Sequence, residues 1–152
     1  MKNVVKLIIC IALVSGIAVL DSCKKSTIKG CKDPDSKNYN SKAEEDDGSC
    51  TYEGSMVFWY DEATSDSLVA DGANALTYYV DGVVVGSSAT SVYWTGAPDC
   101  DQSGSVTINK DLGSNKSRTA TYSVKDETGF EYWSGTVIFT ANTCAANQLT
   151  YQ

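Results

Sequence analysis

The chain has 152 residues, and several features that many enzymes and binding proteins use are scarce or missing. It contains no histidine, which excludes a Ser-His-Asp or Cys-His relay, His-ligated zinc and an imidazole pH switch. Its 12 basic residues are outnumbered by 19 acidic ones. The net charge of −7 disfavours a nucleic-acid partner, because such partners are bound through Lys and Arg that neutralise phosphates. What remains is one small domain, with a short addition at most, that lacks most of the usual hydrolase machinery.

The first 22 residues have the pattern of a signal peptide. A basic start, from Met1 to Lys6, precedes an uncharged apolar run over residues 7–20. This run is well short of the roughly 20 apolar residues that a permanent transmembrane helix needs. The order and the length are typical of a signal that directs export and is then removed. We therefore expect an exported protein.

The segment Leu20-Asp21-Ser22-Cys23 resembles the lipobox of bacterial lipoproteins. The resemblance lies in a large aliphatic residue three places before the cysteine and a small residue directly before it. It implies that Cys23 becomes the first mature residue and carries thioether-linked diacylglycerol and an N-acyl chain such as palmitate. Two or three acyl chains hold a protein on a membrane more stably than one chain does. The alternative is an ordinary secretory signal that is cut elsewhere and leaves Cys23 as an odd thiol.

Residues 23–29 would form a lipidated tether, and the charge of this tether bears on which membrane it reaches. Lys24 and Lys25 stand where lipoproteins kept in the inner membrane of diderm bacteria have an acidic signal. Lipoproteins exported to the cell surface in Bacteroidota-type bacteria usually have an acidic stretch there too. The resemblance therefore implies an outer-membrane protein, with the periplasmic leaflet favoured over the cell surface. The membrane, contacted through the lipid, is one expected partner.

Six cysteines are present, and four of them are expected to form disulfides. One lies in the signal peptide and another is the lipidation candidate. The remaining four allow three connectivities. We expect the local pairing, Cys31 with Cys50 and Cys100 with Cys144, because each pair lies within one region of the chain. A zinc–thiolate site is not expected, because no C-x-x-C pair occurs.

Residues 30–52 form a separate segment, GCKDPDSKNYNSKAEEDDGSCTY, rich in turn-forming Asp, Asn and Gly. It has almost nothing to bury, so we expect the disulfide to hold it in shape. The segment resembles the repeat G-C-x-D-P-x-A-x-N-Y-N-x-x-A-x-x-D-D-G-S-C-x-Y of exported and surface proteins in Bacteroidota-type bacteria. Ser36 stands where the repeat usually has Ala, and one copy is present. The repeat is not tied to an activity, so it implies an exported location and no specific chemistry.

The acidic and amide residues of this segment raise a calcium hypothesis, because hard cations bind carboxylate and carbonyl oxygens. The candidate ligands are Asp33, Asp35, Asn38, Asn40, Asp46 and Asp47. Their spacing is not that of an EF-hand loop. The favoured interpretation is therefore that they are turn residues on a solvated loop, and no cofactor is expected.

The remaining chain, residues 54–152, is predicted to be all-β. Short β-branched and aromatic runs recur between Gly, Asn, Asp and Ser, and no stretch has apolar residues at helical spacing. We expect strands at 55–60, 75–80, 83–87, 91–94, 104–109, 118–125, 131–140 and 147–151. Asp81-Gly82 between two apolar runs predicts a two-residue type I′ hairpin. Together these features predict an immunoglobulin-like or transthyretin-like antiparallel β-sandwich, preceded by the small disulfide-closed loop module.

This region also resembles small lipoprotein domains of the same bacteria. The shared features are a strand that ends Tyr-Val-Asp-Gly, then Pro98-Asp99-Cys100, a Trp-Ser-Gly-Thr-Val strand, and Thr143-Cys144. The resemblance implies that Cys100 and Cys144 staple the sandwich. Related sandwiches commonly serve in binding or scaffolding, but a fold alone does not carry a function.

We expect a membrane-anchored, non-catalytic binding or structural module with a protein or glycan partner in the cell envelope. A second hypothesis is a carbohydrate-binding accessory lipoprotein, because aromatic side chains stack on sugar rings. Trp94 is the candidate for this role, because it lies beside a loop sequence. Trp59 and Trp133 are instead expected in the core, which aromatic residues dominate in such domains.

A third hypothesis is a glycoside-active enzyme that uses a pair of carboxylates. Asp61 with Glu62, or Asp99 with Asp101, would supply the pair. Such an enzyme needs one carboxyl group in an apolar site, and both pairs lie in polar, turn-like surroundings. We therefore do not expect an enzyme.

Overall fold

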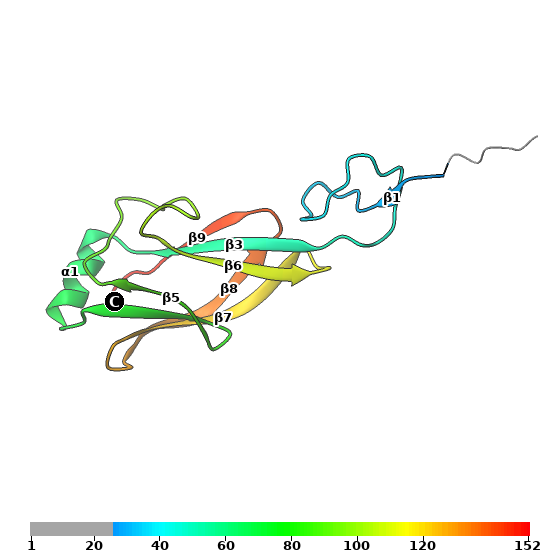
Figure 1. Ribbon diagram of the computed structural model, residues 1–152. Helices are drawn as coiled ribbons and strands as arrows, with labels where there is room; N and C mark the ends of the chain where they lie inside the picture. Colours follow the sequence, from blue (N-terminus) through cyan, green and yellow to red (C-terminus); the bar gives the residue numbers. More distant parts are fainter. Residues whose placement is uncertain (1–25) are drawn as a thin grey trace, which may run out of the picture.

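The computed structural model describes residues 26–152. The predicted signal peptide, Cys23 and the start of the tether lie outside the described residues. Figure 1 shows a long molecule with a small lobe around β1 at one end and a β-sandwich running away from it. The described elements are β1 (Lys29–Gly30), β2 (Glu45–Asp46), β3 (Tyr52–Trp59), α1 (Glu62–Ala70), β4 (Ala75–Val80), β5 (Val83–Ala89), β6 (Val106–Gly113), β7 (Ser117–Asp126), β8 (Glu131–Thr140) and β9 (Cys144–Gln148).

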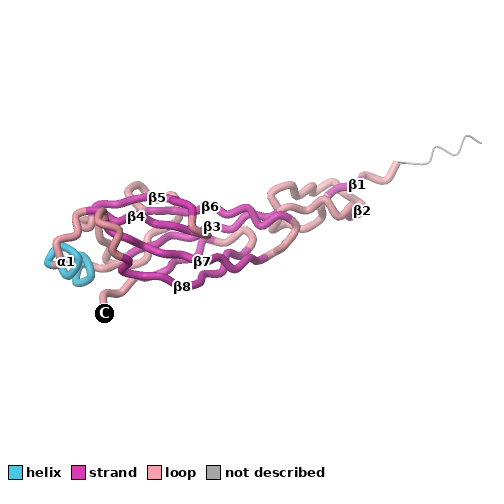
Figure 2. Tube along the Cα trace, turned by 90° about the horizontal axis from the view of Figure 1, so that it is seen from below, coloured by secondary structure: helices cyan, strands magenta, loops and turns pink. Residues whose placement is uncertain are grey.

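Two sheets make up the sandwich, one with the order β6-β3-β9 and the other with the order β5-β4-β7-β8. Their strands run along the length of the molecule (Figure 2). The expected all-β sandwich is confirmed. One pair differs from an antiparallel arrangement, because β3 lies parallel to β9. The chain enters β9 from β8, which lies in the other sheet. Because no hairpin joins β9 to β3, no short turn forces these two strands to be antiparallel.

The strand order distinguishes the two architectures that the sequence left open. Counted from β3 as the first strand of the sandwich, one sheet holds strands 4-1-7 and the other 3-2-5-6. A constant-type immunoglobulin domain places its first and second strands side by side in one sheet. Here β3 and β4 lie in different sheets, so the order departs from the immunoglobulin alternative.

The core lies between the two sheets and follows the period-two pattern of the sequence. In β4, Leu76, Tyr78 and Val80 are buried, and the residues between them are partly exposed. In β8, Phe139 is fully buried whereas its neighbour Ile138 is 59% exposed. Alternation in a strand with one buried face therefore identifies the inward side chains.

The predicted β4–β5 hairpin is confirmed. Asp81 and Gly82 have φ angles of 49° and 76°, the positive values that a type I′ turn requires. The Asp81 carboxylate accepts a hydrogen bond from the Thr121 N–H at 3.1 Å and forms an ion pair with Lys110 at 2.7 Å. The turn is therefore tied to both neighbouring strands, β7 in its own sheet and β6 in the other.

A helix that the sequence did not predict, α1, connects β3 to β4. The Asp61 carboxylate caps the helix and accepts a hydrogen bond from the Thr64 N–H at 2.9 Å. The buried residues of the helix are Thr64, Ser65 and Leu68. The expectation of no helix was wrong here, because a buried face made mostly of small polar residues has no apolar periodicity.

The strand expected at 91–94 is also wrong. These residues form a loop in which the Val92 N–H donates to the Ala89 carbonyl at 3.1 Å and the Trp94 N–H donates to the Tyr60 carbonyl at 3.0 Å. Such single bonds to strand ends hold a loop without forming a ladder. The final expected strand, 147–151, lies three residues earlier in the chain as β9.

The N-terminal lobe, residues 26–51, precedes the sandwich. Its two short strands, β1 and β2, pair in parallel, and among its residues only Gly30, Cys31 and Ser36 are buried. The lobe contacts the sandwich through Asp33, whose carboxylate lies 2.6 Å from the Lys116 ammonium group. The lobe is therefore attached by polar contacts in addition to the chain connection at Thr51.

Candidate functional site

A cleft of about 450 Å³ opens at one edge of the sandwich, and aromatic side chains dominate its lining. The lining residues are Asp71, Tyr122, Phe130, Glu131, Tyr132, Trp133, Ser134, Tyr151 and Gln152. They come from the end of α1, from β7, from the start of β8 and from the C-terminal tail. A volume of this size is typical of sites for small molecules.

The sheet geometry explains why the cleft opens at the start of β8. At the other end of β8 the sheets approach closely, since a Cβ at Gly54 of β3 would lie 2.5 Å from the Thr140 carbonyl oxygen. The sheet that contains β3 has one strand fewer than its partner, and β9 ends at Gln148. The start of β8 therefore faces the C-terminal residues 149–152, and the cleft lies between them.

A β-bulge directs two consecutive aromatic side chains into this cleft. Val124 of β7 pairs with Trp133, and Lys125 pairs with Glu131, so Tyr132 is an extra residue in β8. A bulge re-aims side chains that would alternate between the two faces of a regular strand. Tyr132 and Trp133 consequently both line the cleft.

The C-terminal tail forms the opposite wall and is fixed by bonds to the sandwich. The Trp133 indole N–H donates to the Thr150 carbonyl at 2.9 Å. The Leu149 N–H donates to the Trp59 carbonyl at 2.8 Å, and the Leu149 side chain is buried. The Tyr151 hydroxyl donates a short hydrogen bond to the Asp71 carboxylate. The wall is therefore held by contacts with three other elements, β8, β3 and the end of α1.

Tyr132 is in contact with three other aromatic rings of the cleft. Its ring centroid lies 5.0 Å from that of Phe130, 5.6 Å from that of Trp133 and 6.3 Å from that of Tyr151. The corresponding interplanar angles are 76°, 39° and 46°. The rings thus face different directions and do not form one flat surface. Phe130 is 61% exposed, so part of this aromatic surface is open to solvent.

The β7–β8 loop positions Phe130 at the rim of the cleft. The Asp126 carboxylate accepts hydrogen bonds from the Phe130 N–H at 2.9 Å and from the backbone and hydroxyl of Thr128. The bond from the Thr128 hydroxyl lowers the pKa of Asp126 most, and the backbone bonds add to it. The next residue, Glu127, accepts hydrogen bonds from the backbone N–H groups of Asn74 and Ala75. These bonds fix the loop to the start of β4.

Negative charge surrounds the aromatic rings. Burial raises the pKa of Tyr132, and the nearby carboxylates of Asp71, Asp126 and Glu127 raise it further. Glu131 also lines the cleft, although it forms an ion pair with Lys125 at 3.4 Å. No Lys or Arg is among the residues that line the cleft within 26–152. The cleft therefore combines aromatic faces with nearby carboxylates.

A second hollow, of about 350 Å³, lies where the N-terminal lobe meets the sandwich. Its lining is polar and includes Asp35, Lys37, Glu53 and Asn142. Lys37 and Glu53 form an ion pair at 2.8 Å across it. Asp35 pairs instead with Lys116, at 3.2 Å. The charged side chains of this hollow are therefore already in ion pairs, and the Lys37–Glu53 pair links the lobe to β3.

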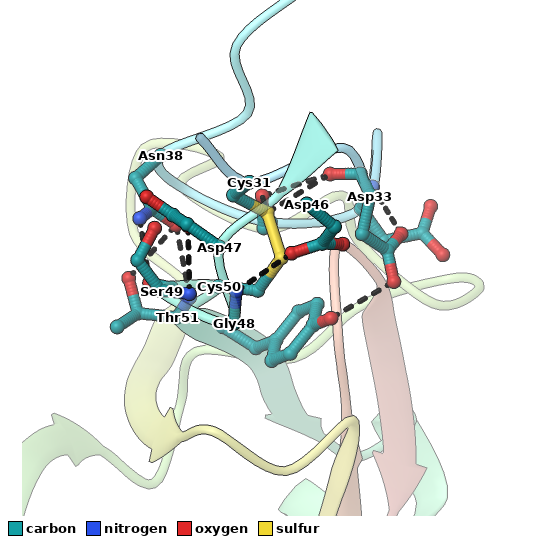
Figure 3. The surroundings of a disulfide bond; sticks show 12 residues. Cys31, Asp33, Asn38, Asp46, Asp47, Gly48, Ser49, Cys50 and Thr51 are labelled. Atoms are coloured by element: carbon teal, nitrogen blue, oxygen red, sulfur yellow. Dashed lines mark hydrogen bonds between the residues drawn. A yellow bond between two sulfur atoms is a disulfide. The ribbon is translucent and has the colours of Figure 1, made fainter. Parts of the chain in front are cut away.

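Both predicted disulfides are confirmed. Cys31–Cys50 closes the lobe, with Cα atoms 4.9 Å apart (Figure 3). Cys100–Cys144 joins the loop before β6 to the start of β9, with Cα atoms 5.9 Å apart. Each bond therefore lies within the region in which the sequence placed it.

The calcium candidates of the lobe lie in turns or ion pairs. Asp46 and Asp47 accept hydrogen bonds from the N–H groups of Gly48 and Ser49, at 2.8 and 3.0 Å (Figure 3). Asn40 similarly accepts from the residue two places on, and Asn38 contacts the residues that flank Cys50. No group of three or more Asp, Glu, Cys or His side chains in residues 26–152 is placed to hold a metal ion.

The first two candidates, Asp33 and Asp35, both contact Lys116 of the sandwich, at 2.6 and 3.2 Å. Asp33 also accepts a hydrogen bond from the Asp35 N–H at 3.1 Å and one from the Tyr52 hydroxyl at 2.8 Å. The bond with Lys116 contributes most to lowering the pKa of Asp33. This geometry favours the interpretation that the acidic residues of the lobe build its turns and its contact with the sandwich.

Trp94 and the proposed carboxylate pairs do not join the aromatic cleft. The Trp94 ring is half-buried and lines a hollow of about 10 Å³, which has room for about one water molecule at most. Asp61 caps α1, and Glu62 accepts a hydrogen bond from the Tyr93 hydroxyl at 3.0 Å. Asp99 and Asp101 are exposed in the loop that contains Cys100. These carboxylates lie in polar surroundings, as the sequence suggested.

The sequence reasoning missed the cleft residues, although one signal was present. Phe130, Tyr132 and Trp133 are three aromatic residues among four consecutive positions, and Tyr132-Trp133 interrupts strict alternation. Interrupted alternation in a strand is a sign of a bulge. The contributions of Asp71 and Tyr151 had no such local signal, because only the tertiary structure brings them to β8.

Comparison with protein-family models, with curated proteins and with solved structures gives no match. Among residues 26–152, no helix is long and apolar enough to cross a membrane.

Proposed function

We propose that the protein is an exported lipoprotein, anchored to the outer membrane through Cys23, whose sandwich is a non-catalytic binding module. The observation that carries this proposal is the place of the aromatic cleft. The cleft is built at the α1 and C-terminal end of the sandwich, and the lobe that follows the anchor lies at the opposite end (Figures 1 and 2). An anchored domain of this shape holds its cleft away from the membrane.

The contacts between lobe and sandwich support this arrangement. Lys116 contacts two lobe carboxylates, and the Lys37–Glu53 ion pair joins the lobe to β3. These contacts limit the swing of the sandwich relative to the lobe. Two disulfides in a chain of this size are in keeping with export, because disulfides persist in oxidising compartments.

Detergent-phase partitioning tests the anchor. Expressed in a diderm bacterium, the full chain should partition into the detergent phase and incorporate labelled palmitate. Cys23→Ala should abolish the label, because the thioether is formed on that sulfur. Cys10→Ala is the matched control and should label normally. Incorporation that persists in Cys23→Ala would overturn the assignment. Protease treatment of intact cells then distinguishes the two leaflets, since release of the domain would place it on the cell surface.

A second candidate is carbohydrate binding, and the exposed ring of Phe130 is the observation that favours it. We therefore assign this hypothesis to the aromatic cleft in place of Trp94. Binding of the full chain to a glycan array should then fall in Phe130→Ala and stay unchanged in Trp94→Ala. If glycan binding instead fell in Trp94→Ala and stayed unchanged in Phe130→Ala, the glycan site would be the loop at Trp94.

A further inference from the structure

We propose that the aromatic cleft binds the alkylammonium group of a small organic cation. This inference rests on the proposed role as a binding module and names the ligand class of the same cleft. It is carried by three observations: the mutual orientation of the rings, the charge of their surroundings and the rigidity of the walls.

The orientation of the rings distinguishes a cation from a flat ligand. Flat ligands, and the apolar C–H face of a sugar ring, stack on one aromatic face or on coplanar faces. The rings around Tyr132 instead meet at 39° to 76°. Rings that face different directions around one cleft can direct several π-faces at a compact group, which is how aromatic cages recognise quaternary ammonium.

The charge of the surroundings favours a cation over a neutral ligand. Asp71 and Glu131 line the cleft, and Asp126 and Glu127 act on the Tyr132 hydroxyl from the adjoining loop. Among residues 26–152, the one basic side chain paired with a lining residue is Lys125, which contacts the ring of Tyr79 outside the cleft. The potential of several carboxylates raises the local concentration of cations and adds to the attraction of the ring faces.

The walls of the cleft are held before any ligand arrives. The Asp126 turn fixes the backbone at Phe130, the β-bulge sets the direction of Tyr132, and the Trp133 ring is bonded to the tail through its indole N–H. A site whose side chains are already ordered loses less conformational entropy on binding. The cleft volume of about 450 Å³ fits a small molecule, and a small cation is therefore the proposed occupant.

The test uses choline and its uncharged carbon isostere, dimethylbutanol, which match in shape and differ in charge. The full chain is kept in an uncharged polyoxyethylene detergent, which contains neither sugar nor ammonium. Binding is followed through the Trp133 indole N–H resonance, assigned by its loss in Trp133→Phe. Choline should shift this resonance saturably, and dimethylbutanol should bind about tenfold more weakly, because it lacks the cation–π attraction.

Two variants and two matched controls connect the binding to the cleft. Phe130→Ala removes an exposed ring, and Asp71→Asn removes a charge while keeping an oxygen that accepts the Tyr151 bond. Each should weaken choline binding by about threefold to tenfold. Tyr39→Ala removes an exposed ring from the lobe, and Asp66→Asn removes an exposed charge from α1 outside the cleft. Both controls should bind choline as the unaltered protein does.

The outcomes separate this inference from the proposed function. Equal binding of choline and dimethylbutanol would show an apolar site and overturn the cation assignment. Tighter binding of a neutral methyl glycoside would also overturn it, while leaving a binding module with a glycan ligand. Tighter binding of a lysine-rich peptide would replace the small cation with a protein partner. No response of the resonance to any of these probes would overturn the cleft as a binding site. A full chain that carries no lipid on Cys23 would instead count only against the proposed anchor.

Discussion

The N-terminal lobe and the sandwich belong to one chain but are held in shape by different forces. In the sandwich, apolar side chains from both sheets form one buried cluster. In the lobe only three residues are buried, and Asp and Asn side chains bond to nearby backbone N–H groups around a disulfide. A segment of this size buries too little apolar surface to offset its conformational entropy. The comparison shows that a polar segment becomes a defined structure when a cross-link restricts its unfolded state.

The largest expected effect comes from a cavity in the sandwich core. Phe139→Ala should lower the free energy of unfolding by about 3–5 kcal/mol, because the Phe139 side chain is fully buried. Ile138→Ala is the matched control on the opposite face of β8 and should change it by less than about 0.5 kcal/mol. Urea unfolding followed by tryptophan fluorescence measures both. Equal losses for the two variants would contradict the assigned faces of β8.

Removing each disulfide should affect only its own region. In the chain-entropy model, loss of Cys100–Cys144 costs the sandwich about 4 kcal/mol and loss of Cys31–Cys50 costs the lobe about 3 kcal/mol. Double Cys→Ser variants, followed by amide hydrogen exchange, measure this region by region. The lobe should lose protection in the Cys31/Cys50 variant while β4 and β7 keep theirs. Loss of protection throughout the sandwich would show that the lobe is part of its folding unit.

The stability of the sandwich should depend on pH through Glu127, in the loop between β7 and β8. Hydrogen bonds from the Asn74 side chain and from backbone N–H groups lower the pKa of Glu127 to about 2, from an ordinary value of 4.5. The contribution of the Glu127 carboxylate to the free energy of unfolding is therefore complete above pH 4.5 and is lost as the pH falls toward 2. Carbon NMR titration of the Glu127 carboxyl should give the lowered pKa directly. Glu127→Gln should remove this part of the acid dependence, whereas exposed Glu45→Gln in the lobe should not.

The smallest effect on stability is expected at the contact between the two regions. Lys116→Met should remove the ion pairs with Asp33 and Asp35 while keeping an unbranched side chain near the Tyr52 ring. Exposed ion pairs contribute little to the free energy of unfolding, so the melting temperature should hardly move. The orientation of the lobe relative to the sandwich should instead become less restricted. NMR relaxation measures this, and identical tumbling of both regions in the variant would show that other contacts suffice.

Much of the fold followed from local features of the sequence. The type I′ hairpin was predictable because Asp81-Gly82 adopts positive φ more readily than most dipeptides. The buried face of β4 was predictable from alternation, and the disulfide partners from their places in two regions. The helix α1 was not, because Thr64 and Ser65 are buried through specific contacts that no hydropathy pattern records. The surroundings of Trp94 were not predictable for the same reason, because its loop sequence did not show that the ring is packed.

The sequence alone was enough to predict a cross-linked lobe and an all-β domain, because those properties depend on residues that interact with near neighbours in the chain. The aromatic cleft could be found only in the folded protein. Its walls come from α1, the start of β8 and the C-terminal tail. The bulge that aims Tyr132 and Trp133 depends on the register between β7 and β8. Register is a property of two paired strands, and the unequal number of strands in the two sheets is a property of the whole sandwich, so neither is written in any single segment.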